Sequence, residues 1–223
     1  MSGEREKSPQ DDRAAQAEAD AAGKRYDASY YERWYRRSRV GVGQREFVER
    51  KVRLALSAAE YVLGRKANSV LDVGCGEAPW RAILKRMRPR LRYQGIDSSD
   101  YAVEKFGRRR NIRKGGLAEL GFMGLEGPFD LVVCADVLHY VRSPEVRQGL
   151  TALAPLVGGA AFLEAFTSTD EIEGDRDNFQ NRTPAVYHHF FKEAGLVPVG
   201  LHVYVTRTAH EELVALERGA PGR

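Results

Sequence analysis

Two glycines and one aspartate near the middle of the chain are the residues best suited to hold a ligand. The apolar run Val70–Val73 predicts a buried strand that ends in Gly74-x-Gly76, ahead of a predicted helix. Glycines at such a turn can take positive φ and leave no Cβ between the backbone and a ligand. About twenty residues later a second short strand ends at Asp97, where nucleotide-binding βαβ units hold a ribose diol. The spacing predicts one site that joins the glycine turn to Asp97.

The motifs around this turn resemble those of a known family. Val70–Gly76, Gly95–Ser99 and Phe129–Tyr140 follow one another as in the Rossmann-like (class I) methyltransferases of the small-molecule type, which use S-adenosylmethionine. The resemblance extends from about Asn68 to the C-terminus. It implies S-adenosyl-L-methionine as cofactor and S-adenosyl-L-homocysteine as product, and it does not identify the acceptor.

The resemblance also implies which residues would hold the cofactor. They lie in the glycine turn, at neighbouring strand ends and in an aromatic segment ahead of them: Tyr30, Asp72, Gly74, Cys75, Gly76, Asp97, Ser98, Gly116, Leu117, Cys134, Ala135, Asp136 and His139. Because this cofactor has no phosphate, we expect the turn to serve close approach and Asp97 to accept from both ribose hydroxyls. Alternatively, Asp97 caps the next helix. A buried Asp72 bonded to amides of the following turn is compatible with a role in shaping the site.

Two positions depart from the family's pattern. Ala78 stands where a third glycine is common, and Gly116 stands where relatives often have an acid that accepts from the adenine amino group. We expect the backbone N–H of Leu117 to meet the ring instead, with Phe122 or Leu120 packed on it. Ordinary core packing is the alternative for these two side chains.

The resemblance implies methyl transfer from the cofactor to an acceptor. This reaction needs alignment of the acceptor and, for some acceptors, a base. Histidine suits this role because its pKa lies near neutrality. The candidates on the acceptor side are His139, His188, His189 and Glu164, with Tyr187 as a further group. Since Phe190 and Phe191 must face the core, we expect one of the paired histidines to point inward and the other into solvent. A His139 bonded to a neighbouring strand is an equal alternative.

A polar loop at 167–183 follows the strand that closes the acceptor side. Its acidic residues are Asp170, Glu171, Glu173, Asp175 and Asp177. Long loops of this kind are more often substrate lids than filler, and the acidity favours a small acceptor that bears a cation or amine. We therefore expect methyl transfer to an O or N atom of a small molecule. An RNA- or protein-modifying enzyme and a cofactor-binding protein without turnover are the alternatives.

Periodicity and turn signals predict the elements that position these residues. Strands are predicted at 69–73, 93–97, near Ile112, at 129–135 and at 160–166, and helices at 44–65, 79–87, 100–106, 145–156 and 185–194. Two further β-like runs, Leu196–Val205 and Leu213–Leu216, close the chain. This alternation indicates an α/β, Rossmann-like, doubly wound sheet. The resemblance implies seven mostly parallel strands with an antiparallel last strand, plus N-terminal helices.

The predicted organisation has a single catalytic domain. It comprises a flexible or frayed helical N-terminus at 1–24, a helical segment or lid at 25–66, the methyltransferase domain at 67–217 and a tail at 218–223. In relatives, aromatic residues such as Tyr30 and Tyr31 can line the methyl-donor pocket, which favours the lid interpretation. A helix that lays its aromatic face on the body is the alternative.

Composition limits the class of protein. The length of 223 residues suits one α/β domain with extensions. We expect a cytoplasmic protein, because neither an apolar run of about 18 residues nor a signal peptide occurs. Cys75 and Cys134 lie in apolar contexts, which predicts reduced thiols and no metal site.

The basic residues exceed the acidic ones by four and are unevenly distributed. They form three clusters: Arg33, Arg36, Arg37, Arg39 and Arg45; Arg81, Lys85, Arg86, Arg88, Arg90 and Arg92; and Lys105, Arg108, Arg109, Arg110, Arg113 and Lys114. These clusters could bind nucleic acid or form the solvated outer faces of helices, and the acidic loop near the expected mouth favours the second interpretation.

Overall fold

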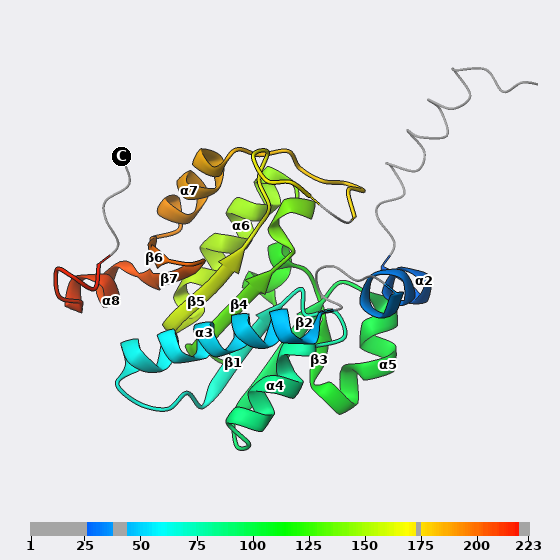
Figure 1. Ribbon diagram of the computed structural model, residues 1–223, viewed down its shortest axis with the longest axis horizontal. Coiled ribbons are helices and arrows are strands. Elements are labelled where there is room, and N and C mark those ends of the chain that lie inside the picture. The colour runs from blue at the N-terminus through cyan, green and yellow to red at the C-terminus, as the bar shows by residue number, and fades with distance from the viewer. Residues whose placement is uncertain (1–25, 38–43, 173–174, 219–223) are drawn as a thin grey trace, which may run out of the picture.

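The molecule is built on one sheet with helices on both faces (Figure 1). The computed structural model describes residues 26–37, 44–172 and 175–218. Within these ranges the seven-stranded sheet has the order β3-β2-β1-β4-β5-β7-β6. Its strands are β1 Ser69–Val73, β2 Arg92–Asp97, β3 Ile112–Lys114, β4 Phe129–Ala135, β5 Val157–Glu164, β6 Leu196–Gly200 and β7 Val203–Thr206. Strands β1 to β5 are parallel, and β7 pairs antiparallel with β5 and β6. The predicted Rossmann-like fold with an antiparallel last strand is confirmed.

The helices begin and end at residues that suit those positions. Proline occupies the first turn of α4, α6 and α7, where no backbone N–H is needed. Gly64, at φ 62°, ends α3 in the left-handed conformation. The helices are α2 Ala28–Tyr31, α3 Arg45–Leu63, α4 Pro79–Met87, α5 Asp100–Arg110, α6 Ser143–Leu153, α7 Pro184–Glu193 and α8 Arg207–Glu212. Shorter turns are the π-helical η1 Glu32–Arg37 and the 3-10 turns η3 Leu117–Phe122, η4 Leu138–Tyr140 and η5 Ala154–Leu156.

Each face of the sheet has its own apolar core. Helices α3 and α4 cover one face, where Leu56 and Ile83 pack with Val70 of β1. Helices α6 and α7 cover the other, where Leu150 and Phe190 pack in the core that contains Leu71. Neighbouring residues of β1 therefore face opposite cores, and burial of all five residues of the strand fixes its position at the centre of the molecule.

The strand order places a crevice at one edge of the sheet. Strand β1 pairs with β2 on one side and with β4 on the other. The strands that follow β1 in the sequence are therefore added first on one side of it and then on the other, so the strand order reverses at β1. In open α/β sheets, ligands bind beyond the carboxyl ends of the strands at this point. The ends of β1, β2 and β4 carry Gly74, Asp97 and Asp136, respectively.

Some predicted elements differ from the structure. The run Leu213–Leu216 is an irregular turn, not a strand, and Leu216 is 99% exposed, because no neighbouring strand pairs with it within the described ranges. The predicted helix 100–106 continues to Arg110, and the predicted helix 145–156 begins at Ser143. The predictions for 1–24 and for 219–223 lie outside the described residues. In the described part of the chain, no helix is long and apolar enough to span a bilayer.

Candidate functional site

The glycine turn after β1 is tied to the end of β2 by backbone hydrogen bonds. The N–H groups of Gly74 and Cys75 donate to the carbonyl of Ile96 at 2.8 and 3.1 Å. Gly74 and Gly76 have φ values of 71° and 53°. A Cβ at Gly74 would overlap the side chain of Val137, and one at Gly76 would overlap the Tyr35 hydroxyl. Both positions therefore require glycine for conformation and for space.

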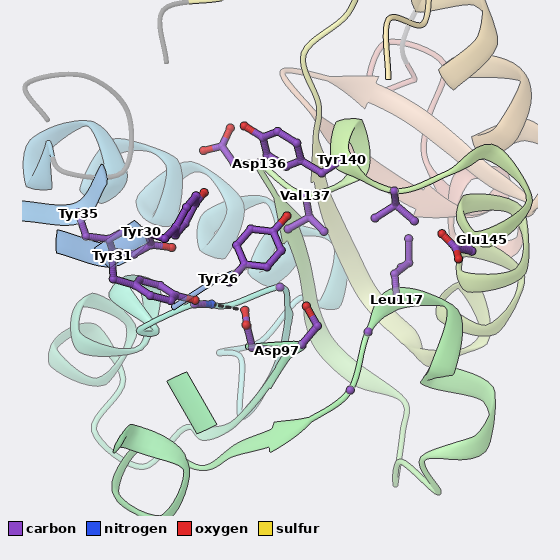
Figure 2. A pocket seen from close by; sticks show the side chains of 16 residues that line it. Tyr26, Tyr30, Tyr31, Tyr35, Asp97, Leu117, Asp136, Val137, Tyr140 and Glu145 are labelled. Carbon is purple, nitrogen blue, oxygen red and sulfur yellow. Dashed lines mark hydrogen bonds between the residues drawn. The ribbon is translucent and has the colours of Figure 1, made fainter. Parts of the chain in front are cut away.

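Asp97 is held by backbone amides on both carboxylate oxygens. Gly76 N–H donates to Oδ2 at 2.6 Å, as the dashed line in Figure 2 shows, and Ser99 N–H donates to Oδ1 at 2.8 Å. Burial raises the pKa of Asp97, and these two amides oppose that effect. The helix cap of α5 is Ser99, whose Oγ accepts from Ala102 N–H at 3.1 Å. The remaining lone pairs of the carboxylate can accept from Tyr31 or from a ligand hydroxyl.

A first cavity of about 230 Å³ opens beside this turn. Figure 2 shows Asp97 and Val137 on its walls, with Tyr26 and Tyr30 contributed by the N-terminal segment. The lining residues are Tyr26, Tyr30, Tyr31, Tyr35, Gly74, Gly76, Asp97, Ser98, Gly115, Gly116, Leu117, Asp136, Val137, Tyr140, Val141 and Glu145. Gly74, Gly76 and Asp97 thus share one cavity, as their spacing predicted.

The aromatic segment packs on the body and also faces this cavity. Tyr31 is 2% exposed and stacks on Tyr101 of α5, with ring centroids 5.1 Å apart. Tyr30 meets Tyr31 edge-on at 5.5 Å. Asp27 caps α2 by accepting from the N–H groups of Ser29 and Tyr30, both at 3.0 Å. Tyr30 and Tyr31 therefore pack on the body and also line this cavity, and the interpretation of the segment as a lid stays a prediction.

A second cavity, of about 430 Å³, lies between α3, η1 and the loop after β5. Aromatic and acidic side chains dominate its lining. The residues are Tyr30, Trp34, Tyr35, Gln44, Phe47, Val48, Lys51, Asp72, Gly74, Cys75, Pro79, Trp80, Ala135, Asp136, His139, Tyr140, Phe166, Glu171, Ile172 and Asp175. Tyr30, Tyr35, Gly74, Asp136 and Tyr140 line both cavities, so the two meet at a common wall.

Three charged groups form a cluster at this wall. Lys51 Nζ of α3 lies 2.5 Å from Glu164 Oε2 of β5 and 3.9 Å from Asp136 Oδ2. Burial and the charge of Glu164 raise the pKa of Asp136, and Lys51 opposes the shift. Oδ1 of Asp136 is buried and accepts no hydrogen bond from the described residues. Asp136 also has φ 60°, a conformation that costs a non-glycine residue energy and is common at functional sites.

A family model described as a methyltransferase domain matches residues 44–207. The chain belongs to this family. No curated protein matches it. The predicted family, Rossmann-like methyltransferases that use S-adenosylmethionine, is confirmed.

Solved structures share the fold of this methyltransferase. Magnesium protoporphyrin IX methyltransferase from Synechocystis PCC 6803, with bound S-adenosylhomocysteine, has a TM-score of 0.56 and 19% identity over 77% of this chain and 86% of that one. An S-adenosylmethionine-dependent methyltransferase from Archaeoglobus fulgidus has a TM-score of 0.58 and 15% identity over 76% of this chain and 75% of that one. DesVI from Streptomyces venezuelae has a TM-score of 0.55 and 16% identity over 73% of this chain and 91% of that one. At these identities the similarity shows the fold.

Most predicted cofactor residues line a cavity of the methyltransferase, but Cys134 does not. Ser98, Gly116 and Leu117 line the first cavity, and Cys75 and Ala135 line the second. Cys134 is fully buried in the core beneath α6 and α7, because its side chain points to that face of β4. Its side chain therefore cannot contact the cofactor, and a contact through its backbone stays a prediction.

Asp72 is bonded differently from the prediction. Its Oδ2 accepts from the Tyr93 hydroxyl at 2.7 Å, not from amides of the following turn. Burial raises the pKa of Asp72 to about 7. The amides of Gly74 and Cys75 are unavailable to it, because both donate to Ile96.

His139 faces the second cavity and is bonded to a neighbouring segment. Its Nδ1 accepts from Phe166 N–H at 3.3 Å, just beyond β5, and its ring lies 5.3 Å from that of Phe166. Because Nδ1 accepts, a neutral ring carries its hydrogen on Nε2. This bond agrees with the alternative of a histidine held by a neighbouring segment, and a base role of His139 stays a prediction.

The other predicted catalytic residues lie elsewhere. Both His188 and His189 are exposed on α7, and His189 Nε2 lies 3.2 Å from Glu193 Oε1. The expectation that one points inward is wrong, because Tyr187, Phe190 and Phe191 occupy the whole inward face. Tyr187 is buried in the core and accepts from Arg182 Nη1 at 3.2 Å, and it lines neither cavity. Glu164 also lines neither cavity and contacts the site through Lys51.

The expected adenine side is only partly as predicted. Leu117 lines the first cavity, whereas Phe122 is 85% exposed and Leu120 is buried in the core, so neither packs there. The N–H of Gly116 donates to Glu119 Oε2 at 2.7 Å. Glu145, at the start of α6, lines this cavity and carries a carboxylate that the sequence prediction missed.

The acidic loop contributes Glu171, Ile172 and Asp175 to the second cavity. Tyr140 Oη donates to the carbonyl of Asp175 at 3.0 Å, which joins the loop to η4. Buried Arg182 anchors the end of the loop by donating to the carbonyl of Leu138 at 3.0 Å and to that of Val141. These bonds join the described part of the loop to η4 and the residue that follows it, beside the cavity, and its role as a lid stays a prediction.

Proposed function

We propose that this methyltransferase transfers a methyl group from S-adenosylmethionine to an O or N atom of a small molecule in the second cavity. The observation that carries the proposal is the common wall of the two cavities, formed by Gly74, Asp136 and Tyr140 with two tyrosines of the N-terminal segment. Donor and acceptor would meet there, where alignment supplies most of the catalysis.

The residues of the first cavity fit the cofactor. Gly74 and Gly76 line the cavity with main chain, and the buried Asp97 carboxylate can accept from ribose hydroxyls. Leu117 and Val137 supply apolar walls for a planar base. When bound, the cofactor supplies a methyl group already activated on a sulfonium. The chain's own residues bind it, orient the acceptor and exclude water.

Substitution of Asp97 tests the assignment. Hydrogen bonds to a charged acceptor contribute about 1.5–3 kcal/mol each, so Asp97→Ala should weaken binding of S-adenosylhomocysteine by at least about tenfold. Isothermal titration calorimetry measures this, with Asp100→Ala as the control, because Asp100 is an exposed acid three residues away that lines neither cavity. Unchanged affinity in Asp97→Ala would remove the ribose assignment.

Acceptor class is tested by screening. S-adenosylhomocysteine release is measured with amines, phenols, hydroxy acids and a mixed RNA as acceptors. Turnover confined to RNA would replace the small-molecule proposal by the RNA alternative.

Part of the second basic cluster holds helices together: Arg86 and Arg88 pair with Glu49 and Glu60 of α3 at 3.1 and 2.5 Å. Cytoplasmic location stays a prediction that cell fractionation can test.

A further inference from the structure

The charges around the common wall are not balanced within the protein. Asp136 and Glu164 share one ammonium, that of Lys51, which lies closer to Glu164. If all three groups are ionised, the cluster carries one excess negative charge. Burial makes that charge expensive, which is why the pKa of Asp136 is raised. One further cation beside Asp136 would complete the cluster.

The rest of the second cavity has the same sign. Glu171 and Asp175 add carboxylates to its lining, and Lys51 is its cation among the residues that the structure describes. An anionic ligand would meet repulsion on this surface, whereas a cation would be attracted. The argument combines charge with a cavity of about 430 Å³, which is large enough for a small organic molecule.

Aromatic side chains line the space between these carboxylates. Trp34, Phe47 and Trp80 contribute rings, as does Tyr140 beside Asp136. The Phe47 ring already makes a cation–π contact with an ammonium group, since Lys51 Nζ lies 4.3 Å from its centroid. Aromatic faces together with carboxylates are the surfaces that recognise alkylammonium groups. An apolar or aromatic body with one amine would match both features.

We propose that the acceptor is an amine whose ammonium form binds at Asp136, with its apolar body against the aromatic wall and Lys51 as the residue that positions the carboxylate. The Asp136 carboxylate takes one proton from the ammonium, which frees the nitrogen lone pair to accept the methyl group. This inference rests on the proposed function, because it names the substrate class of the second cavity. An ammonium could also come from the amino-acid part of the cofactor, since Asp136 lines both cavities. The structure favours the acceptor, because Lys51, whose Nζ lies 3.9 Å from Asp136 Oδ2, lines the second cavity and not the first.

The test uses three probes of one shape: phenethylamine, 2-phenylethanol and 3-phenylpropanoate. Each is titrated into the full-length protein saturated with S-adenosylhomocysteine, and its affinity is measured by calorimetry or ligand-observed NMR. We expect the amine to bind about tenfold more tightly than the alcohol, and the carboxylate to bind most weakly. A wild-type protein without a preference for the amine, including one that binds none of the probes, overturns the proposal.

Asp136→Asn keeps the shape and removes the charge. It should lower the affinity for the amine about tenfold while changing that for the alcohol by less than about twofold. Glu171→Gln is the matched control, because it removes an exposed acid of the same cavity and should leave the preference within about twofold. An equal loss in both variants would indicate a diffuse field and overturn the role of Asp136.

Binding of S-adenosylhomocysteine separates this inference from the proposed function. Asp136→Asn should keep that affinity within about threefold of wild type. A tenfold loss with unchanged amine preference would assign Asp136 to the cofactor's amino group and overturn the inference alone. A wild-type protein that does not bind S-adenosylhomocysteine would instead refute the proposed function. Thermal melting of each variant establishes that it is folded.

Discussion

The two cavities are built from different parts of the polypeptide. The first has main chain on part of its wall, where Gly74, Gly76, Gly115 and Gly116 line it and backbone amides hold the Asp97 carboxylate. Tyrosines of the N-terminal segment complete the wall. The second is shaped by side chains from α3, η1, the strand ends and the loop after β5. The difference teaches that local turns set the form of one site, whereas long-range packing sets the form and charge of the other.

Two buried aspartates show the same contrast at the level of single groups. Asp97 accepts from two backbone amides, which oppose the effect of burial on its pKa. Asp72 lies on the wall of the second cavity and accepts from the Tyr93 phenol, and its pKa rises to about 7. Main-chain donors stabilise a carboxylate as an anion, whereas a lone phenol leaves the pKa of Asp72 close to physiological pH.

The largest effect is expected at Gly74, a main-chain position that lines both cavities. Gly74→Ala adds a methyl group against Val137 at a φ of 71°. Overpacking and left-handed backbone together cost about 2–4 kcal/mol. We expect the turn to shift away from Val137 and the affinity for S-adenosylhomocysteine to fall about 100-fold by calorimetry.

Gly64→Ala is the control for Gly74→Ala. It has a similar φ of 62° at the end of α3, but no atom lies within 4 Å of its Cβ position. It should cost only about 1–2 kcal/mol of stability in urea unfolding and leave cofactor affinity unchanged. Similar effects of the two substitutions on binding would show that space at Gly74 is not what shapes the cavity.

An intermediate effect sharpens the contrast between Asp97 and Asp72. The pKa of Asp72 is 3.8 when unperturbed and about 7 in the folded protein. Between these pH values the folded state holds a proton that the unfolded state has lost, so this group makes stability fall as pH rises. Asp72→Asn cannot ionise and should remove that loss, which is on the order of 4 kcal/mol at most.

Urea unfolding at pH 5 and pH 8 measures the effect of Asp72→Asn. The wild-type protein should lose more stability between the two pH values than the variant does. Equal losses would mean that Asp72 is ionised in the folded protein already at pH 5, and that the Tyr93 phenol suffices to stabilise its charge.

The smallest expected effect defines the boundary of the second cavity. His188 and His189 are exposed and lie outside both linings. The double substitution His188→Ala, His189→Ala should leave kcat/KM for a methylated acceptor within about twofold and stability within about 0.5 kcal/mol. A tenfold loss of kcat/KM at unchanged stability would extend the acceptor site to α7 and contradict the cavity described here.

Sequence patterns predicted the first cavity well because its determinants are local. The glycine turn and Asp97 follow adjacent strands that short apolar runs predict. In the structure, Gly76 N–H donates to Asp97 Oδ2 at 2.6 Å. The second cavity depends on contacts that no local pattern reveals. Lys51 meets Glu164 across 113 positions of sequence, and α3 is recognisable only as an amphipathic helix.

Two errors have physical explanations. The histidines of α7 were expected to divide between core and solvent, but Tyr187, Phe190 and Phe191 at i, i+3 and i+4 define a face that excludes both. The run Leu213–Leu216 is too short for its periodicity to separate a strand from a turn. Its exposure shows that apolar residues alone do not make a strand without a partner to pair with.

Tyr30 and Tyr35 belong to one short segment yet wall both cavities. Because the same two rings contact both spaces, a shift of either ring when one ligand binds would change the wall that the other ligand meets. Such a coupling is reciprocal: donor and acceptor would change each other's affinity by the same factor.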